Sequence, residues 1–490
     1  MTKNPDQSLW ESILPECCLE TPPELARVDA LLDDVAFFEP YRAHFDPEHG
    51  RRSTPIETYL RMMFLKFRYK LSYEVLCREV ADSISWRRFC RIPLGAAVPH
   101  PTTLMKITTR CGEATIAKLN QTLLEKAAAA KVLKLHKVRA DTTVVEANVA
   151  YPTDSGLLAK AVARMARLVE RIHAAGGAAR TKVRDRRRAA GRRVRNIAAN
   201  LKLRNDDAKE KVRQINAELA DLAETAAGEA VAVARNARRK LARCGDGASK
   251  KLAALVAELE ATMALTATVV AQTRTRLGGD KPDGATRVVS LHDPDARPIA
   301  KGRLGKPVEF GYKAQVLDNA DGVVLDHRVV MGNPPDAPML APAVARVKAL
   351  VGRAPRAVTA DGIYGEAAVE DGLKAMGVKT VVIPRKGKPD AARRQVQGRR
   401  SFRRLVKWRT GCEGRISHLK HGYGWNRTLL DGLGGAQTWC GLGVLAHNAV
   451  KVSALLDAKA NPKPRPRPAA PPRPKATAPP RRQPPPSLLG

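Results

Sequence analysis

The sequence has little negative charge for its length. Its 490 residues include 49 Asp and Glu against 85 Lys and Arg, which leaves a formal net charge of +36. The pI is about 10.3. A protein this basic usually has a polyanion as its partner. Nucleic acid is the first candidate and an anionic membrane surface is the second.

Long apolar segments are also missing. We find no apolar run of the roughly 18 residues that span a bilayer, and no apolar signal-peptide core at the N-terminus. These absences predict a cytoplasmic protein with no membrane partner. The eight cysteines form no C-x-x-C pair, and no Cys or acid pair completes a zinc set around His418 and His421. The sequence therefore argues against a zinc site and a disulfide framework.

The first patterned stretch, residues 53–132, is expected to be helical. Apolar residues recur at helical spacing from Ile56 to Phe67, after Thr54 as N-cap and Pro55 at the first helical position. A second helix should begin near Ser72.

Three clustered arginines, Arg87, Arg88 and Arg91, precede a long helix that Thr102 and Thr103 are expected to cap. Short helices with an arginine cluster suit a DNA reader of the helix-turn-helix kind. The alternative is a helical scaffold with a solvated basic face. The net charge favours DNA contact by these arginines.

Residues 157–276 contain no proline and are rich in Ala, Arg and Leu. Glycines are expected to divide them into helices near residues 176–177, 191, 228 and 245–247. Between Arg180 and Arg204 stand eleven Lys and Arg against one acid, Asp185. Such a density of like charge repels itself unless anions lie along it. The stretch is therefore either a solvated face or a surface for DNA phosphates.

Strand patterns flank this helical stretch. The expected strands cover residues 137–146, 286–291, 308–317, 322–331, 356–360 and 379–384. The third and fourth would form an antiparallel hairpin. The last two enclose a helix, so they form a β-α-β unit, and open α/β sheets commonly carry their sites where such strands end.

Three acids are the candidates for catalysis. Asp141 lies in a run of strand-forming residues, and a buried carboxylate is costly unless a cation neutralises it. Asp361 ends the first strand of the β-α-β unit. Glu413 lies on a helix expected around 405–421, where a turn of about 100° per residue puts it on one face with Arg409 and Lys420.

Taken alone, Glu413 and its cations could be a simple ion pair on a helix. Taken with the two strand acids, they predict a site in which all three carboxylates hold metal. Carboxylates of this kind suit Mg²⁺, and two ions, replaceable by Mn²⁺, can act on a phosphodiester. Arg409 and Lys420 would then hold DNA phosphates.

The segments around these residues resemble the bacterial insertion-sequence transposases with a DDE triad. "ADTTVVEANVAYPTDSGLL" is similar to the segment around that family's first acid, and "TADGIYG" to that around the second. Arg409, Glu413 and Lys420 reproduce the R-x3-E-x6-K signature around the third. Other segments, such as "NPPDAP", resemble the ISNCY group. Related families often have a tyrosine where Val406 stands.

The resemblance covers roughly residues 50–455 and implies an α/β protein. Its catalytic domain would have a ribonuclease-H-like mixed sheet with helices on both faces. An all-α DNA-binding domain would precede it, and a long helical insertion would interrupt it. The expected divisions are an N-terminal segment of unknown role (1–50), the DNA-binding domain (51–132), the catalytic domain (133–156 and 286–455), the basic insertion (157–285) and a disordered Pro/Arg-rich tail (456–490).

The activity implied is metal-dependent cleavage of double-stranded DNA at an element's terminal inverted repeats, followed by strand transfer to target DNA. The protein would act as a homodimer in a synaptic complex at the bacterial nucleoid. A metal-dependent nuclease on the same fold and a catalytically inactive DNA-binding regulator are the alternatives. An apolar seam could join two chains or close within one; its residues are Leu252, Leu255, Val256 and Leu259.

Other residues are weaker candidates. Glu146 should face away from Asp141 on a strand, and Asp336 and Glu366 could support the site from outside. Trp425 could stack on an unpaired base, but core packing is favoured. Local roles in a hairpin turn are expected for Asp318, Asp321 and Asp326.

Overall fold

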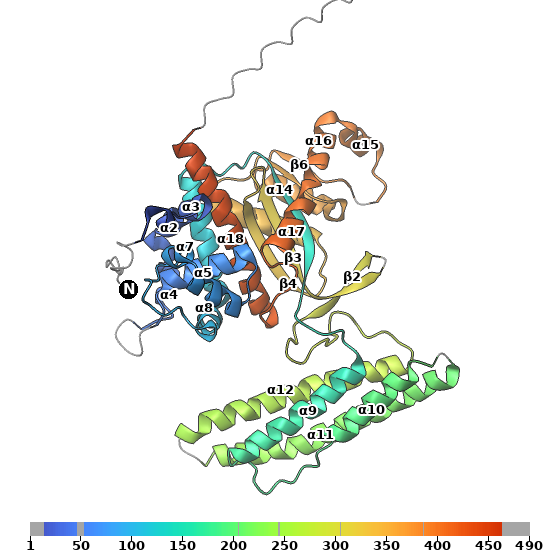
Figure 1. Ribbon diagram of the computed structural model, residues 1–490. Helices are drawn as coiled ribbons and strands as arrows, with labels where there is room; N and C mark the ends of the chain where they lie inside the picture. The colour runs from blue at the N-terminus through green and yellow to red at the C-terminus, as the bar shows by residue number, and fades with distance from the viewer. Residues whose placement is uncertain are drawn as a thin grey trace, which may run out of the picture.

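The computed structural model describes residues 14–46, 53–203, 205–243, 246–303, 305–385 and 387–462 (Figure 1). Residues 456–460, expected to begin the tail, are instead the end of a helix, and the rest of the expected tail lies almost wholly outside the described residues.

In the described part of residues 14–132, all regular elements are helices. These elements are α2 (Glu16–Leu19), α3 (Pro23–Leu32), η1 (Val35–Phe37), α4 (Glu39–Arg42), α5 (Ile56–Tyr69), α6 (Tyr73–Asp82), α7 (Ile84–Phe89) and α8 (Pro101–Ala129). The apolar stripe expected on α5 is buried from Ile56 to Phe67. α18 (Gly432–Ala460), an apolar helix from the other end of the chain, packs against α3, α5 and α8.

Helix starts differ in detail from those expected. Ser72 caps α6, since its hydroxyl accepts a hydrogen bond from the Val75 backbone N–H at 3.1 Å. Pro55, and not Thr54, is the N-cap of α5. His100 caps α8 in place of the threonine pair, because its ring nitrogen accepts from the Thr102 N–H.

The core of the molecule is a mixed six-stranded sheet. Its strands are β1 (Val138–Glu146), β2 (Arg297–Arg303), β3 (Lys306–Asn319), β4 (Val324–Met331), β5 (Ala357–Thr359) and β6 (Thr380–Val382). The order is β2-β3-β1-β5-β6, with β4 also paired to β3. β3 runs antiparallel to β1, β2 and β4, whereas β5 runs parallel to β1 and β6. The expected mixed sheet after a helical N-terminal region is confirmed.

One expected strand, 286–291, is wrong. Gln272 donates a hydrogen bond to the Val288 carbonyl and accepts one from its N–H, both at 3.1 Å. This occupies the backbone groups that a sheet would need. Val288 and Leu291 instead pack against the helices between β1 and β2. The strand that forms is β2, six residues later.

Helices cover both faces of the sheet. Alternate side chains of a strand point to opposite faces. On one face, Thr142 of β1 donates to Asp336 at the start of α13 (Ala337–Val351). On the other, Arg139 of β1 bonds to the carbonyl of Trp408, in α16 (Arg400–Arg409), just before α17 (Gly411–Gly422). The remaining elements here are η2 (Gly362–Tyr364), α14 (Ala367–Ala375) and α15 (Ala391–Gly398).

Residues between β1 and β2 form an antiparallel bundle that stands below the sheet in Figure 1. Its helices are α9 (Asp154–Ala174), α10 (Arg187–Asn200), α11 (Asp206–Leu241) and α12 (Asp246–Leu277). The expected breaks at Gly191 and Gly228 are wrong, because α10 and α11 run through them.

The apolar seam on α12 closes within one chain. Its four residues, Leu252, Leu255, Val256 and Leu259, are at most 4% exposed and pack against α9 and α11.

Two helices are long and apolar enough to cross a membrane by length and composition alone, at Lys250–Leu277 and Gly432–Ala460. The expectation that the chain has no such segment was therefore wrong. α12 packs in the bundle and α18 is mostly buried in the core, as core helices of globular proteins are. Neither helix is an argument for a membrane.

Candidate active site

Asp141 lies on β1, and Asp361 follows the neighbouring parallel strand β5 by two residues. Val138 and Arg139 of β1 pair with Val358 and Thr359 of β5. Continuing this register by two residues places Asp361 beside Asp141. The chain leaves β5 in an extended conformation at Asp361, whose carboxylate accepts the Gly362 N–H at 2.5 Å and so caps η2.

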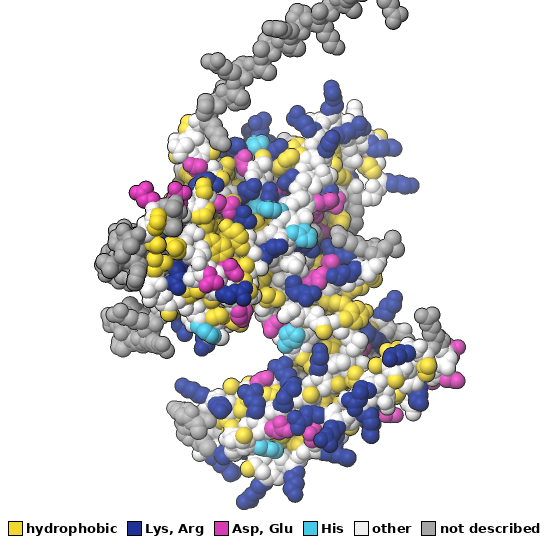
Figure 2. All heavy atoms as spheres, viewed as in Figure 1, with side chains coloured by type: hydrophobic (Ala, Val, Ile, Leu, Met, Phe, Trp, Pro, Cys, Tyr) yellow, Lys and Arg dark blue, Asp and Glu magenta, His cyan; other side chains and the backbone are white. Residues whose placement is uncertain are grey.

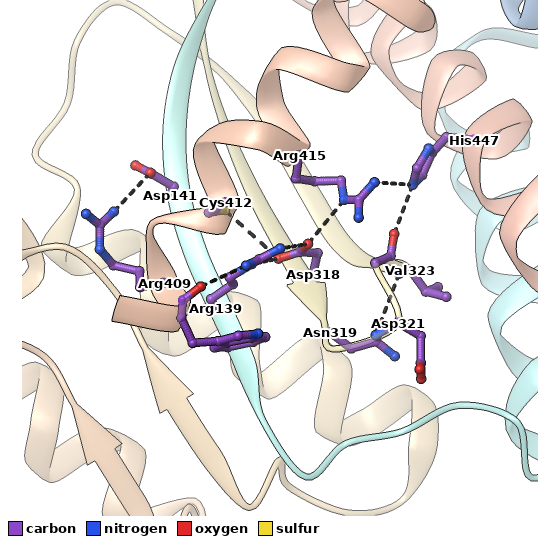
Figure 3. A network of polar contacts seen from close by, with 12 residues as sticks. Arg139, Asp141, Asp318, Asn319, Asp321, Val323, Arg409, Cys412, Arg415 and His447 are labelled. Carbon is purple, nitrogen blue, oxygen red and sulfur yellow. Dashed lines mark hydrogen bonds and ion pairs between the residues drawn. The ribbon is translucent and has the colours of Figure 1, made fainter. Parts of the chain in front are cut away.

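The third acid, Glu413, lies on a helix that packs against β1. The helix expected around 405–421 is two helices, α16 and α17, which meet at Thr410. Glu413 lies in the first turn of α17 and Lys420 in its last turn. Arg409 ends α16, and its Nη1 lies 3.3 Å from Oδ2 of Asp141 (Figure 3). The junction thus brings Arg409 to β1, with Glu413 in the turn that follows.

The pKa of Asp141 is raised above its ordinary value. Burial is the largest cause, and the charges of Asp361 and Glu413 raise the pKa further. A backbone hydrogen bond from Thr142 and the charge of Arg409 act in the opposite direction. The three acids therefore lie within electrostatic reach of one another, in a setting where one added cation would be stabilising.

The side chains suit a divalent metal in type, since carboxylate oxygens are the ligands that Mg²⁺ prefers. In the part of the chain that the structure describes, however, no three His, Cys, Asp or Glu side chains gather closely enough to hold an ion. Oδ2 of Asp141 is instead paired with Arg409. That the three acids share a metal stays a prediction.

The sequence analysis missed a buried carboxylate beside this site. Asp318 was expected to have a local role in a turn, but it lies on β3 opposite Arg139 and is 0% exposed. Arg139 donates to both Asp318 oxygens, at 2.7 and 2.9 Å, and Arg415 of α17 donates at 3.2 Å (Figure 3). Arg139 was the signal that could have revealed this carboxylate. It is a basic residue two positions before Asp141, and alternate residues share one face of a strand.

This network ties the α16–α17 junction to the sheet. Arg139 also donates to the Trp408 carbonyl at 2.9 Å, and its guanidinium lies 4.7 Å from the Trp408 ring. Gly411 allows the close approach, since a Cβ there would lie 2.4 Å from Arg139 Nη1. Arg409 and Glu413, on either side of the junction, are positioned by these contacts.

The weaker acids separate into different roles. Glu146 pairs with Lys306 and Arg427 and does not face Asp141. Asp336 accepts from Thr142, the neighbour of Asp141, and pairs with buried Lys313. Glu366 is exposed at the start of α14. Asp321 pairs with Lys134, and Asp326 with Arg346.

The arginines expected to contact DNA already have partners in the chain. Arg87 donates to the carbonyls of Ala81, Pro93, Leu94 and Ala96. Arg88 donates to the Leu19 carbonyl. Arg91 pairs with Asp29 and Asp33. DNA contact by these three would have to share or exchange these bonds, and it stays a prediction.

Trp425 belongs to the core. It is 0% exposed, and its indole N–H donates to the Cys440 carbonyl at 3.0 Å. The core-packing interpretation is therefore confirmed.

Two protein families match the chain. Residues 16–110 match the family described as Transposase domain (DUF772), and residues 274–449 match the one described as Transposase DDE domain. The second match includes Asp361, Glu413 and Lys420 and leaves out β1 with Asp141. Comparison with curated proteins and with solved structures gives no match.

Proposed function

Since this chain belongs to the DDE transposases of insertion sequences, which cleave DNA, we propose that it cuts a phosphodiester at the element's ends and joins the freed 3′-hydroxyl to target DNA. The observation that supports the proposal is the pairing of β1 with β5, which, continued by two residues, would put Asp141 beside Asp361, with Glu413 in the first turn of α17. Assignment to the ISNCY group is part of the proposal.

Asp141, Asp361 and Glu413 are the residues that would hold the metal, Mg²⁺ with Mn²⁺ as a substitute. Bound divalent ions would supply activation of the attacking oxygen and stabilisation of the leaving oxygen. The chain's own part is to position the DNA. Arg409 would exchange the Asp141 carboxylate for a DNA phosphate, because a guanidinium binds both in the same geometry. Lys420, in the last turn of α17, would hold a second phosphate.

The proposed domains follow the fold. The sheet with its covering helices is the ribonuclease-H-like core that a DDE domain implies, and the bundle between β1 and β2 is an insertion into it. The N-terminal helices are the proposed DNA-binding domain. Their family match begins at residue 16, and Leu25 and Leu32 of α3 join the same core as α5. We therefore extend this domain to include α2–α4.

A homodimer on DNA is also proposed, since a transposase must hold two element ends. The seam on α12 is not available for it, because its leucines are buried within the bundle. The dimer contact must therefore use another surface. A cytoplasmic, nucleoid-associated location would follow from the DNA substrate.

The test is a joining assay with the full chain, Mg²⁺ and DNA that carries the inverted repeats flanking the gene. A product in which a 3′-end is linked to a second DNA molecule is expected. If a monomer cuts the DNA efficiently but yields no joined product, the protein is a nuclease and not a transposase. Binding without cutting would identify an inactive DNA-binding regulator.

A further inference from the structure

The outward face of α16 is a row of cations. Residues 391–410 contain eight Lys and Arg and no acid. On α16, four of the cations lie within about 100° of arc on a helical wheel, and all four are exposed: Arg400, Arg403, Arg404 and Lys407. Phe402 and Arg409 lie on the opposite side, where Phe402 is buried.

Among the described residues, these four cations have no acid partner, whereas two cations nearby have one. Arg393 of α15 pairs with Glu370, and Arg409 pairs with Asp141. Among the described residues, no carboxylate lies within ion-pair distance of any of the four. Figure 2 shows Lys and Arg side chains gathered over this end of the molecule. Such a row repels itself and is stabilised by an external anion.

The row leads to the active site. The inner side of α16 packs against β5 and β6, and β5 ends two residues before Asp361. The last residue of α16 is Arg409, and Glu413 follows in the next helix. An anion that lies along the outward face of α16 therefore ends at the α16–α17 junction, which Arg409 and Glu413 adjoin in the chain.

We propose that the outward face of α16 binds the phosphate backbone of the DNA strand on one side of the bond that is cut. Arg400 and Lys407 are about 10 Å apart along the axis. That length matches about three phosphates of one strand, at about 3.4 Å each. Three of the four cations are arginines, which bind phosphate through two parallel N–H groups. The inference rests on the proposed DNA cleavage and adds the path of the substrate.

The test compares two full-length variants with the same loss of charge. R400Q/R403Q/R404Q removes three cations from α16. R235Q/R239Q/R243Q removes three exposed cations from one face of α11 and the residues just after it, in the bundle. Cleavage is measured on a short end DNA, of about ten base pairs on each side of the cut. Phosphates that the protein needs are mapped by ethylation interference, and melting temperatures check both folds.

The α16 variant should raise KM for the short DNA at least tenfold with a smaller effect on kcat. It should also lose the interference signals at about three consecutive phosphates beside the cut. The α11 variant should keep both. Signals lost on the element's strand identify element DNA on α16, and signals lost on the target strand in a joining reaction identify target DNA.

An α16 variant with unchanged KM and interference, while the wild type cuts and joins DNA, would mean that this face is only solvated. The proposed function would then still stand. A wild-type chain that binds no DNA would overturn both proposals. If the triple variant melts early, the single variants R403Q and R404Q replace it, and each should lose an interference signal beside the cut that R235Q keeps.

Discussion

Arg409 Nη1 lies 3.3 Å from Oδ2 of Asp141, and the two side chains are only 12% and 17% exposed. One residue expected to hold a DNA phosphate thus neutralises one expected to hold a metal. Without DNA, the arginine would compete with a metal for Asp141. With DNA, a phosphate would offer the guanidinium a second partner and would release the carboxylate. If the proposed site is right, the pair would therefore couple metal binding to DNA binding.

Removing Arg409 should change how metal binding depends on pH. The charge of Arg409 lowers the pKa of Asp141, so Arg409→Gln should raise this pKa further. Only ionised Asp141 binds a cation, so the midpoint of Mn²⁺ binding, followed by electron paramagnetic resonance, should move to higher pH. Well above that midpoint, binding should be tighter than in the wild type, because no cation competes. Arg235→Gln, with the same loss of charge in the bundle, should leave the curve in place, and equal midpoints for both variants would contradict the coupling.

Amide substitution of each proposed metal ligand should abolish cleavage and keep DNA binding. Asp141→Asn, Asp361→Asn and Glu413→Gln each remove a charge that metal binding needs, and a loss of about 10³-fold or more in cleavage rate is expected. Cleavage of end DNA in gels and binding by fluorescence anisotropy are the measurements. Glu146→Gln, on the opposite face of β1, is the control. A Glu413 variant that still cuts at the wild-type rate would remove Glu413 from the site.

Three arginines of α10 should contact DNA outside the active site. Arg188, Arg192 and Arg195 are exposed on one helical face, and in the described structure no acid pairs with them. Arg186 and Arg193 instead pair with Glu229 and Glu218. R188Q/R192Q/R195Q should weaken binding to all DNA sequences and reduce the slope of log K against log salt by about 0.9 per lost contact. A slope equal to that of R235Q/R239Q/R243Q would mean that these three arginines of α10 do not contact DNA.

Asp318 should be important for stability. Asp318→Asn leaves Arg139 and Arg415 without their buried counter-charge, and breaking a buried pair costs about 3–5 kcal/mol. The free energy of unfolding in urea should fall by an amount of this order. Asp321→Asn, in the turn that follows β3, is the matched control. It breaks a pair with exposed Lys134, which contributes about 0–1 kcal/mol. Similar losses for the two variants would mean that the Asp318 network adds little.

Lys66 should make stability depend on pH. Burial lowers its pKa to about 8 from 10.5, although the ring centroids of Tyr73 and Trp439 lie 4.5 and 4.7 Å from the ammonium. Between these values the unfolded chain binds the proton more tightly, so the free energy of unfolding should rise with pH through this window. The difference between a pKa of 10.5 and one of about 8 sets an upper bound of about 3.4 kcal/mol on this rise.

Lys66→Met should lose that rise and should be more stable than the wild type at pH 7. Urea unfolding of both proteins at pH 7, 8.5 and 10 measures the difference, in which the titration of other groups cancels. A constant difference across the three pH values would show that Lys66 stays charged in the folded protein.

The sequence by itself determined the local elements and the candidate acids. Helical spacing located α5, and strand formers located β1 and the β3–β4 hairpin. The spacing of Arg409, Glu413 and Lys420 indicated a helix there, but not the break at Thr410 that divides it into α16 and α17. Each of these depends on residues a few positions apart, whose geometry follows from the period of a helix or strand.

Only the tertiary structure decided which residues meet across long stretches of chain. The valines of 286–291 suit a strand, but Gln272 takes the backbone groups of Val288. Asp318 reads as a turn residue, yet the pairing of β1 with β3 buries it against Arg139, 179 positions away. The seam on α12 could join two chains until α9 and α11 cover it. Such outcomes depend on which distant partner offers the better burial or the opposite charge, and that choice is made by packing and not by local pattern.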